Sequence, residues 1–187
     1  MPQRYIGFRF QIDTNRINSR GNLKEMNQLK EWEKNGVIEL HISEPAYHEA
    51  SFGNDTKRLK AARDHIISYT FAETPDEHTK IKRIENILFP NGAKNKNEEN
   101  DVEIVFNASK YGYTLVTNDG DSKSQPNGIL GNAETLMREL DIKVMRDVEA
   151  VEIVRREITN RDEICKQIAN KCNKPIPEWV GNDKMDK

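Results

Sequence analysis

Apolar residues recur with two different spacings, and segments with one spacing alternate along the chain with segments that have the other. Residues 4–12 alternate between apolar and polar positions, which predicts a first strand, and short apolar runs predict three more at 37–42, 113–117 and 142–145. Between these runs, apolar residues recur every three or four positions, which predicts helices over 23–35, 44–52, 55–69, 75–89, 101–111, 133–140 and 147–172. Strands that alternate with helices predict an α/β fold, here a three-layer α/β/α sandwich with a mainly parallel central sheet.

Capping and turn residues support these boundaries. Ser43 is a suitable N-cap, and Glu44 and Pro45 follow it in a first helical turn that favours both residue types. Gly112 closes the helix that precedes the third predicted strand. The segment 91–100 is polar and rich in lysine and asparagine, which predicts a solvated loop.

The element pattern predicts one main domain with two additions. The domain spans residues 1–146, and within it the segment 54–90 is expected as a helical insertion over one edge of the sheet. Residues 147–172 are expected to form a C-terminal helical extension. Residues 173–187 contain two prolines and a glycine and are expected to be a flexible tail.

Composition limits the classes of function. The net charge is −2, from 29 Lys and Arg against 31 Asp and Glu, so a protein that binds polyanions needs a local basic patch. Two cysteines, Cys165 and Cys172, imply no disulfide framework and fit a reducing cytoplasm. The start of the chain lacks the apolar core of a signal peptide, and no apolar run is long enough to span a membrane. We therefore expect a cytoplasmic protein with no membrane contact.

Four acidic residues fall where a parallel sheet would bring them together. Asp13 and Asp119 follow the first and third predicted strands, Glu49 lies on the helix after the second, and Asp101 opens the helix before the third. Sites in such sheets form outside the carboxyl ends of the strands. Two carboxylates about 4 Å apart repel by roughly 4 kcal/mol at an effective dielectric constant near 20. A hard divalent cation removes this repulsion, so the pattern predicts a Mg²⁺ or Mn²⁺ site.

The sequence around each acid forms an ordered set of four motifs. They are Ile12-Asp13-Thr14-Asn15, Ile42-Ser43 with Glu49 six residues later, Asp101-x-x-Ile104-x-x-x-Ala108, and Leu115-Val116-Thr117-Asn118-Asp119. In order and spacing this set resembles that of PIN-domain nucleases, the PIN-like ribonuclease family that includes the VapC-like toxins. The resemblance covers roughly residues 5–145. The long basic segment 54–90 and the helix 147–172 depart from the compact toxin-type members.

The resemblance implies a metal-dependent endoribonuclease that hydrolyses RNA and leaves 5′-phosphate and 3′-hydroxyl ends. Asp13, Asp101 and Asp119 would ligate Mg²⁺ or Mn²⁺ directly or through water, Glu49 would hold a water or a second ion, and Asp121 would be an outer ligand. Four neighbouring polar residues would orient the carboxylates: Thr14, Asn15, Thr117 and Asn118. A toxin of a toxin–antitoxin pair, with an antitoxin protein as partner and a homodimeric state, would also fit the family.

RNA contacts are expected from the basic helix face and its surroundings. Phosphate groups would contact Arg16, Lys57, Arg58, Lys60 and Arg63. Tyr47, Phe52 and Tyr69 are candidates for base stacking. A basic helix face of this kind is also commonly only solvated, so both interpretations stay open.

Simpler or rival interpretations exist for several motifs. Asp13 and Asp101 could be ordinary capping residues, and Glu44 competes with Glu49 for the second acidic position. A zinc protease is excluded because Phe52 stands where its helical motif needs a second histidine. An EF-hand fails in the loop that begins at Asp119, which lacks the required Gly and Glu. Two rivals remain: a non-catalytic PIN-like module that binds RNA or a protein, and a metal-dependent phosphatase, which would need Asp where Asn15 stands.

Overall fold

Five strands form one parallel sheet at the centre of the molecule. The computed structural model describes residues 3–18, 20–52, 55–120 and 128–184. The strands are β1 (Arg9–Ile12), β2 (Glu39–Ser43), β3 (Ile66–Ser68), β4 (Thr114–Val116) and β5 (Val144–Met145). They lie in the order β3-β2-β1-β4-β5, and every neighbouring pair is parallel. All strands therefore deliver their carboxyl ends to one edge of the sheet.

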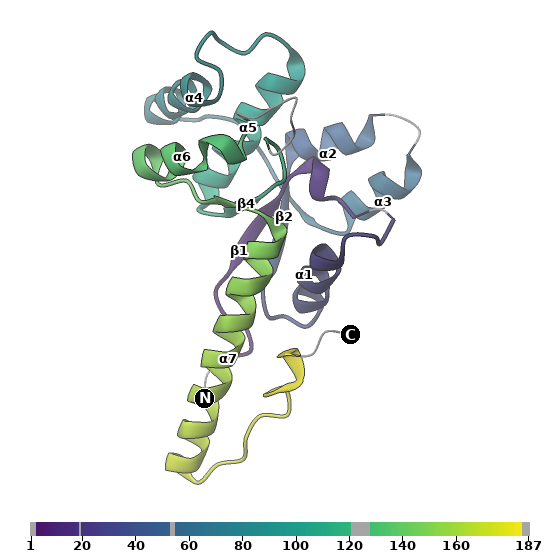
Figure 1. Cartoon of the computed structure of the whole chain (residues 1–187), viewed down its shortest axis with the longest axis vertical. Helices are drawn as coiled ribbons and strands as arrows, with labels where there is room; N and C mark the ends of the chain where they lie inside the picture. The colour runs from purple at the N-terminus through teal and green to yellow at the C-terminus, as the bar shows by residue number, and fades with distance from the viewer. Residues whose placement is uncertain (1–2, 19, 53–54, 121–127, 185–187) are drawn as a thin grey trace.

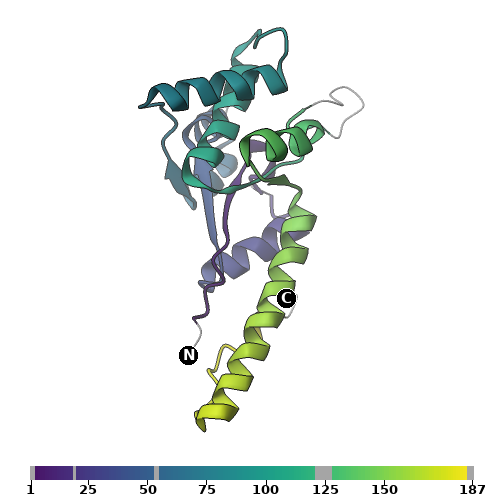
Figure 2. The ribbon, with the colours of Figure 1, turned by 90° about the vertical axis from the view of Figure 1, so that its left-hand side faces the viewer.

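Helices cover both faces of this sheet, so the α/β/α sandwich is confirmed. In the described part of the chain they are α1 (Lys24–Lys34), α2 (Glu44–Ser51), α3 (Thr56–Arg63), α4 (Pro75–Leu88), α5 (Lys96–Tyr111), α6 (Ala133–Leu140) and α7 (Asp147–Cys172), with short 3-10 turns η1 (Thr14–Arg16), η2 (Leu130–Asn132) and η3 (Asn182–Lys184). Figure 1 shows α4, α5 and α6 on one side of the strands and α1, α2 and α3 on the other. The helix α7 packs on α1 and then continues beyond the sheet (Figure 2).

The core lies between these layers. Strand side chains such as Phe10, Ile42 and Leu115 are buried, and Trp32 of α1 and Phe106 of α5 pack against the sheet from the helices. Burying a large apolar side chain stabilises the fold by about 1.5–3 kcal/mol. The sheet edge that carries the strand ends is thereby held rigidly.

Local capping chemistry sets the helix ends near the site. Ser43 ends β2, and its hydroxyl accepts a hydrogen bond from the Ala46 backbone N–H at 3.4 Å, so α2 begins at Glu44 as expected. Gly112 adopts φ 65° and ends α5, a conformation that favours glycine. The predicted helices over 133–140 and 147–172 agree with α6 and α7.

The predicted helix over residues 55–69 is wrong in its second half. The helix α3 ends at Arg63, and Ile66–Ser68 form β3, which pairs with β2 from Ile66 beside His41 to Ser68 beside Ser43. A short apolar run fits a helix and a strand equally well by spacing alone, and the exposed edge of β2 decides between them. The segment 54–90 thus supplies an edge strand as well as two helices.

The predicted loop over residues 91–100 is also wrong in part, because α5 begins at Lys96. The Asn95 side chain accepts a hydrogen bond from the Glu98 backbone N–H at 3.1 Å and caps the helix. Glu98 and Glu99 lie in the first turn, where the helix dipole favours acids. Asp101 therefore lies in the second turn of the helix rather than at its start.

The described part of the C-terminal segment, which ends at residue 184, contacts the main body, whereas a flexible tail was expected over 173–187. The Asp183 carboxylate is buried and forms ion pairs with Arg4 at 2.6 Å and Arg161 at 3.0 Å. The Trp32 indole N–H donates to the Asp183 carbonyl at 2.8 Å, and the Arg161 guanidinium lies over the Trp179 ring. These contacts return the chain from the far end of α7 to the main body.

None of the helices in the described residues is long and apolar enough to cross a lipid bilayer.

Candidate metal-binding pocket

Asp13 is fixed at the end of β1 by three hydrogen-bond donors. Its carboxylate accepts from the Thr14 backbone N–H at 2.6 Å, from the Asn15 amide at 2.6 Å and from the Thr117 hydroxyl at 2.7 Å. The side chain is buried, which raises its pKa to about 6; the donors lower the pKa, and the nearby charges of Glu49 and Asp119 raise it further. Its orientation depends on both β1 and β4, which supplies Thr117 just beyond its end.

Glu49 lies on α2 and joins three elements. One carboxylate oxygen accepts from the Thr14 hydroxyl at 2.6 Å, and the other accepts from the Asn100 amide of α5 at 2.7 Å. The rival residue Glu44 contacts His48 at 3.6 Å on the same helix and does not line the pocket described below. The geometry therefore favours Glu49 over Glu44 as the second acidic position.

Asp101 projects from α5 toward the other acids. Burial raises its pKa to about 8, and the charges of Asp13, Asp119 and Glu49 add to this effect. Within the described residues, no hydrogen-bond donor contacts its carboxylate. The ionised form of Asp101 is therefore less stabilised than that of Asp13.

Asp119 lies three residues beyond β4 and is tied to the end of the following loop. Its carboxylate accepts from the Ile129 backbone N–H at 2.9 Å, and its carbonyl accepts from the Leu130 N–H at 2.9 Å. A Cβ atom at position 128 would clash with the Asp119 carboxylate and with the backbone of Gly120, so only glycine fits at Gly128. Gly128 is a site residue that the sequence did not single out.

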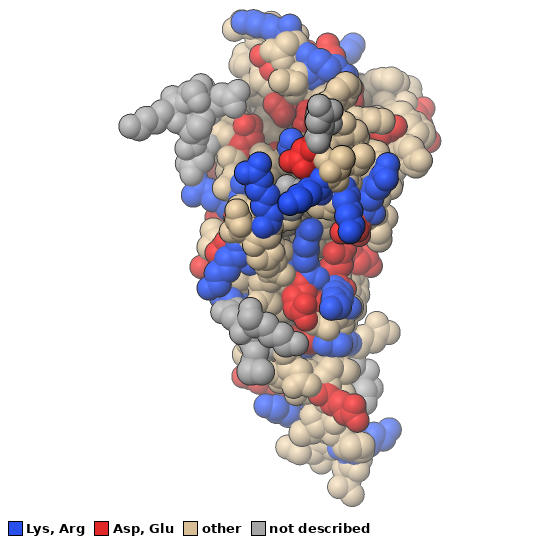
Figure 3. Space-filling view, turned by 90° about the vertical axis from the view of Figure 1, so that its right-hand side faces the viewer, with Lys and Arg blue, Asp and Glu red and all other residues tan. Residues whose placement is uncertain are grey.

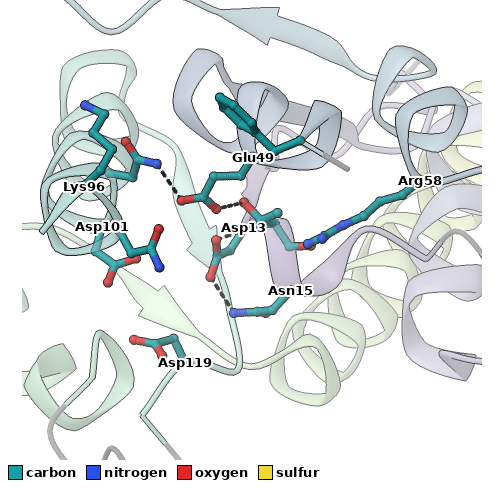
Figure 4. A pocket seen from close by; sticks show the side chains of 11 residues that line it. Asp13, Asn15, Glu49, Arg58, Lys96, Asp101 and Asp119 are labelled. Carbon is teal, nitrogen blue, oxygen red and sulfur yellow. Dashed lines mark hydrogen bonds between the residues drawn. The ribbon is translucent and has the colours of Figure 1, made fainter. Parts of the chain in front are cut away.

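The four acids line a single pocket of about 570 Å³. Its walls consist of residues from η1, α2, α3, α5 and the loop after β4: Asp13, Thr14, Asn15, Glu49, Phe52, Arg58, Lys96, Asn97, Asn100, Asp101 and Asp119. Figure 4 shows the four carboxylates around a shared space, with Lys96 on one side and Arg58 on the opposite side. The acids thus meet as the sequence predicts, and their catalytic role stays a prediction.

The donor set suits a hard divalent cation, although it is not preformed. Among the described residues, no three His, Cys, Asp or Glu side chains already converge on one ligand point. Asp13 and Glu49 are turned toward their hydrogen-bond donors, whereas the Asp101 carboxylate has none in the described structure. Carboxylate oxygens are the ligands that Mg²⁺ and Mn²⁺ prefer, and a bound cation would offset the repulsion that raises the pKa of Asp101. We conclude that these residues fit such an ion after side-chain rotations.

Three of the predicted supporting residues hold the acids through side-chain hydrogen bonds. Thr14, Asn15 and Thr117 each donate a side-chain hydrogen bond to Asp13 or Glu49. Asn118 contributes its backbone N–H to the Asn15 side-chain oxygen at 3.1 Å. Asp121, the predicted outer ligand, lies outside the described residues.

The predicted basic residues divide into one at the pocket and four elsewhere. Arg58 lines the pocket, and its guanidinium donates to the Thr14 carbonyl at 3.1 Å. Arg16 forms an ion pair with Asp147 of α7 at 2.8 Å and does not line the pocket, and its phosphate contact stays a prediction. Lys57, Lys60 and Arg63 are exposed on α3 outside the pocket. Figure 3 shows Lys and Arg side chains gathered on this face of the molecule, with acidic side chains among them.

Three pocket residues were missed because the segment 91–100 was expected to be a loop. Lys96 and Asn97 lie in the first turn of α5, and Asn100 holds Glu49. The spacing Asn95-x-x-Glu98 is a helix-start signal that could have located them.

Comparisons with known proteins give only a weak similarity. No protein-family profile and no curated protein sequence matches the chain. Among solved structures, the chain is similar to the crystal structure of VapBC2 from Rickettsia felis bound to a DNA fragment from their promoter. The TM-score is 0.44, with 20% sequence identity over 65% of this chain and 96% of that chain. A similarity of this size supports no conclusion about activity or partners.

Proposed function

We propose that the protein is a metal-dependent endoribonuclease that hydrolyses phosphodiester bonds of RNA. The observation that supports this proposal is the meeting of four carboxylates from four separate elements in one pocket. Burial and mutual repulsion raise the pKa of Asp13 to about 6 and that of Asp101 to about 8. Carboxyl groups with raised pKa values that lie together in a pocket are typical of functional sites.

The chain's own residues would divide the work of binding and positioning. Asp101 and Asp119 face the pocket on one side and would hold Mg²⁺ or Mn²⁺, with Asp13 as a further ligand. Glu49 would orient a water molecule, since Thr14 and Asn100 fix the direction of its carboxylate. A bound divalent ion supplies Lewis acidity that stabilises the negative charge building up on a phosphoryl group. Arg58 would bind a neighbouring phosphate of the substrate.

The cellular role follows from the sequence resemblance. A toxin of a toxin–antitoxin pair would act in the cytoplasm, pair with a small antitoxin protein and form a homodimer. These parts of the proposal rest on the resemblance to PIN-domain nucleases.

The decisive experiment incubates the purified protein with mixed RNAs in Mn²⁺ or EDTA and maps the ends of the fragments. We expect cleavage only with Mn²⁺, leaving 5′-phosphate and 3′-hydroxyl ends. The substitution Asp119→Asn should reduce the rate at least about 100-fold, because it removes a ligand charge while keeping the side-chain shape. Asp76→Asn is the matched control, since Asp76 is exposed in the first turn of α4 and outside the pocket. Cleavage by Asp119→Asn at the wild-type rate would contradict the proposal.

One observation favours a non-catalytic module as the second candidate. Asp13 and Glu49 are already satisfied by five hydrogen bonds, so two of the four acids could serve structure alone. Calorimetric titration with Mn²⁺ separates the two candidates. Absence of binding by the wild type would favour a module that binds RNA or protein without chemistry.

A further inference from the structure

We propose that Phe52 stacks against the RNA base next to the bond that is cut. This inference rests on the proposed nuclease function and specifies the substrate of the same site. It makes Phe52 a substrate-positioning residue of that site.

Phe52 is an apolar side chain that the described structure leaves largely uncovered. Its side chain is 82% exposed, the highest value among the large apolar residues of the described chain, and it lines the acidic pocket. It directly follows α2, and its backbone N–H bonds to the carbonyls of His48 at 3.1 Å and Glu49 at 3.3 Å. The ring therefore has a fixed attachment point beside Glu49 and an apolar surface that a ligand can cover.

The other two candidates for stacking are disfavoured by their positions. Tyr47 is partly buried, and its hydroxyl accepts a hydrogen bond from Arg63 at 3.3 Å. Tyr69 is 60% exposed but does not line the pocket, because it follows β3 at the edge of the sheet. Of these three aromatic residues, Phe52 is the one that lines the pocket beside the four acids.

Two cations lie beside the acids, and one of them, Lys96, also contacts Glu99 at 3.4 Å and Glu103 at 3.7 Å on its own helix. Arg58 and Lys96 lie on opposite sides of the four carboxylates (Figure 4). A guanidinium has five N–H donors, and the described bond from Arg58 to Thr14 uses one, so a phosphate oxygen can be bound as well. A strand that runs from Lys96 to Arg58 would carry its central phosphate past the acids and present a base to Phe52.

Stacking on Phe52 requires a base that has one face free. A base inside a duplex is stacked on both faces by its neighbours, whereas a base in a single strand can turn a face to an aromatic side chain. Stacking on Phe52 would add binding energy without reading the base identity, because every base has such a face.

The test compares three variants with one labelled oligoribonucleotide, alone and annealed to its complement. Binding is measured by fluorescence anisotropy in an Asp119→Asn background, and cleavage is measured with the same changes in the otherwise native chain. Phe52→Ala should weaken single-strand binding by about 5- to 100-fold. Phe52→Trp should keep the affinity, because it keeps a stacking face. Phe71→Ala should change nothing, because Phe71 is 57% exposed yet outside the pocket.

A second measurement identifies the base. Replacing the nucleotide beside the cleavage site with an abasic one should raise KM for the wild type but add nothing to Phe52→Ala, because the two changes remove the same contact. Equal effects of Phe52→Ala and Phe71→Ala, or duplex bound as tightly as single strand, would overturn the inference. Binding that depends on Phe52 without any cleavage would instead refute the nuclease function and leave the stacking site standing.

Discussion

Replacing Asp101 with asparagine should stabilise the protein when divalent ions are removed. In the folded state the pKa of Asp101 is raised from 3.8 to about 8, by burial first and then by the charges of Asp13, Asp119 and Glu49. Between these two pH values the folded protein holds a proton that the unfolded chain releases. The free energy of unfolding therefore falls as the pH rises toward 8, and a neutral side chain removes this loss.

The size of the effect follows from the same interval. Each pK unit corresponds to about 1.4 kcal/mol, so keeping Asp101 protonated in the folded state at pH 7 lowers the free energy of unfolding by about 4 kcal/mol. An asparagine amide buried in its place costs about 1–3 kcal/mol where it lacks partners. We therefore expect Asp101→Asn to raise the free energy of unfolding by about 2 kcal/mol at pH 7, more at pH 8.5, and not at all at pH 4.

Urea unfolding in EDTA at pH 4, 7 and 8.5 measures this directly. Glu99→Gln is the matched control, because it removes one charge from an exposed position on the same helix. Adding Mn²⁺ should reverse the order, since an ion at 100 times its dissociation constant stabilises the wild type by about 2.7 kcal/mol and the variant by less. An Asp101→Asn protein that is less stable than the wild type at pH 8.5 in EDTA would refute the electrostatic interpretation.

Two further substitutions test the parts of the fold that support the site. Asp183→Asn should lower the free energy of unfolding by about 3 kcal/mol in a urea titration, because it leaves the buried charge of Arg161 less compensated; an unchanged value would mean that the tail contributes no stability. Gly128→Ala should lower the rate of RNA cleavage at least about tenfold, because its methyl group displaces the Asp119 carboxylate; a wild-type rate with Mn²⁺ would show that this carboxylate can move without loss.

The sequence predicts the ends of helices best where the signal comes from residues close to that end. Ser43 and Gly112 act through their own backbone and nearest neighbours, so the ends that they set agree with the structure. The strand Ile66–Ser68 has no such signal, because its identity depends on pairing with β2, which lies more than twenty residues away in the sequence. The start of α5 does have a local signal, because Asn95 caps the helix. The polar composition of residues 91–100 nevertheless led to the prediction of a loop there.

The same distinction applies to the acids. Asp13 and Asp119 could be placed from the sequence, because parallel strands bring their carboxyl ends to one edge whatever the helices do. Glu49 and Asp101 reach that edge only through the packing of α2 and α5, which contact each other in the structure. Their motif spacing suggested this meeting, and the packing of the two helices accounts for it physically.

The difference in pKa between Asp13 and Asp101 could not be predicted from the sequence. Asp13 receives three hydrogen bonds, and two of their donors, Asn15 and Thr117, also bond to each other across more than a hundred residues. Asp101 is surrounded by carboxylates and has no donor within the described structure, so its pKa rises further than that of Asp13. Asp101 therefore keeps its proton to a higher pH than Asp13. A cation that enters should displace the proton of Asp101, while the hydrogen-bonded Asp13 keeps the end of β1 in place.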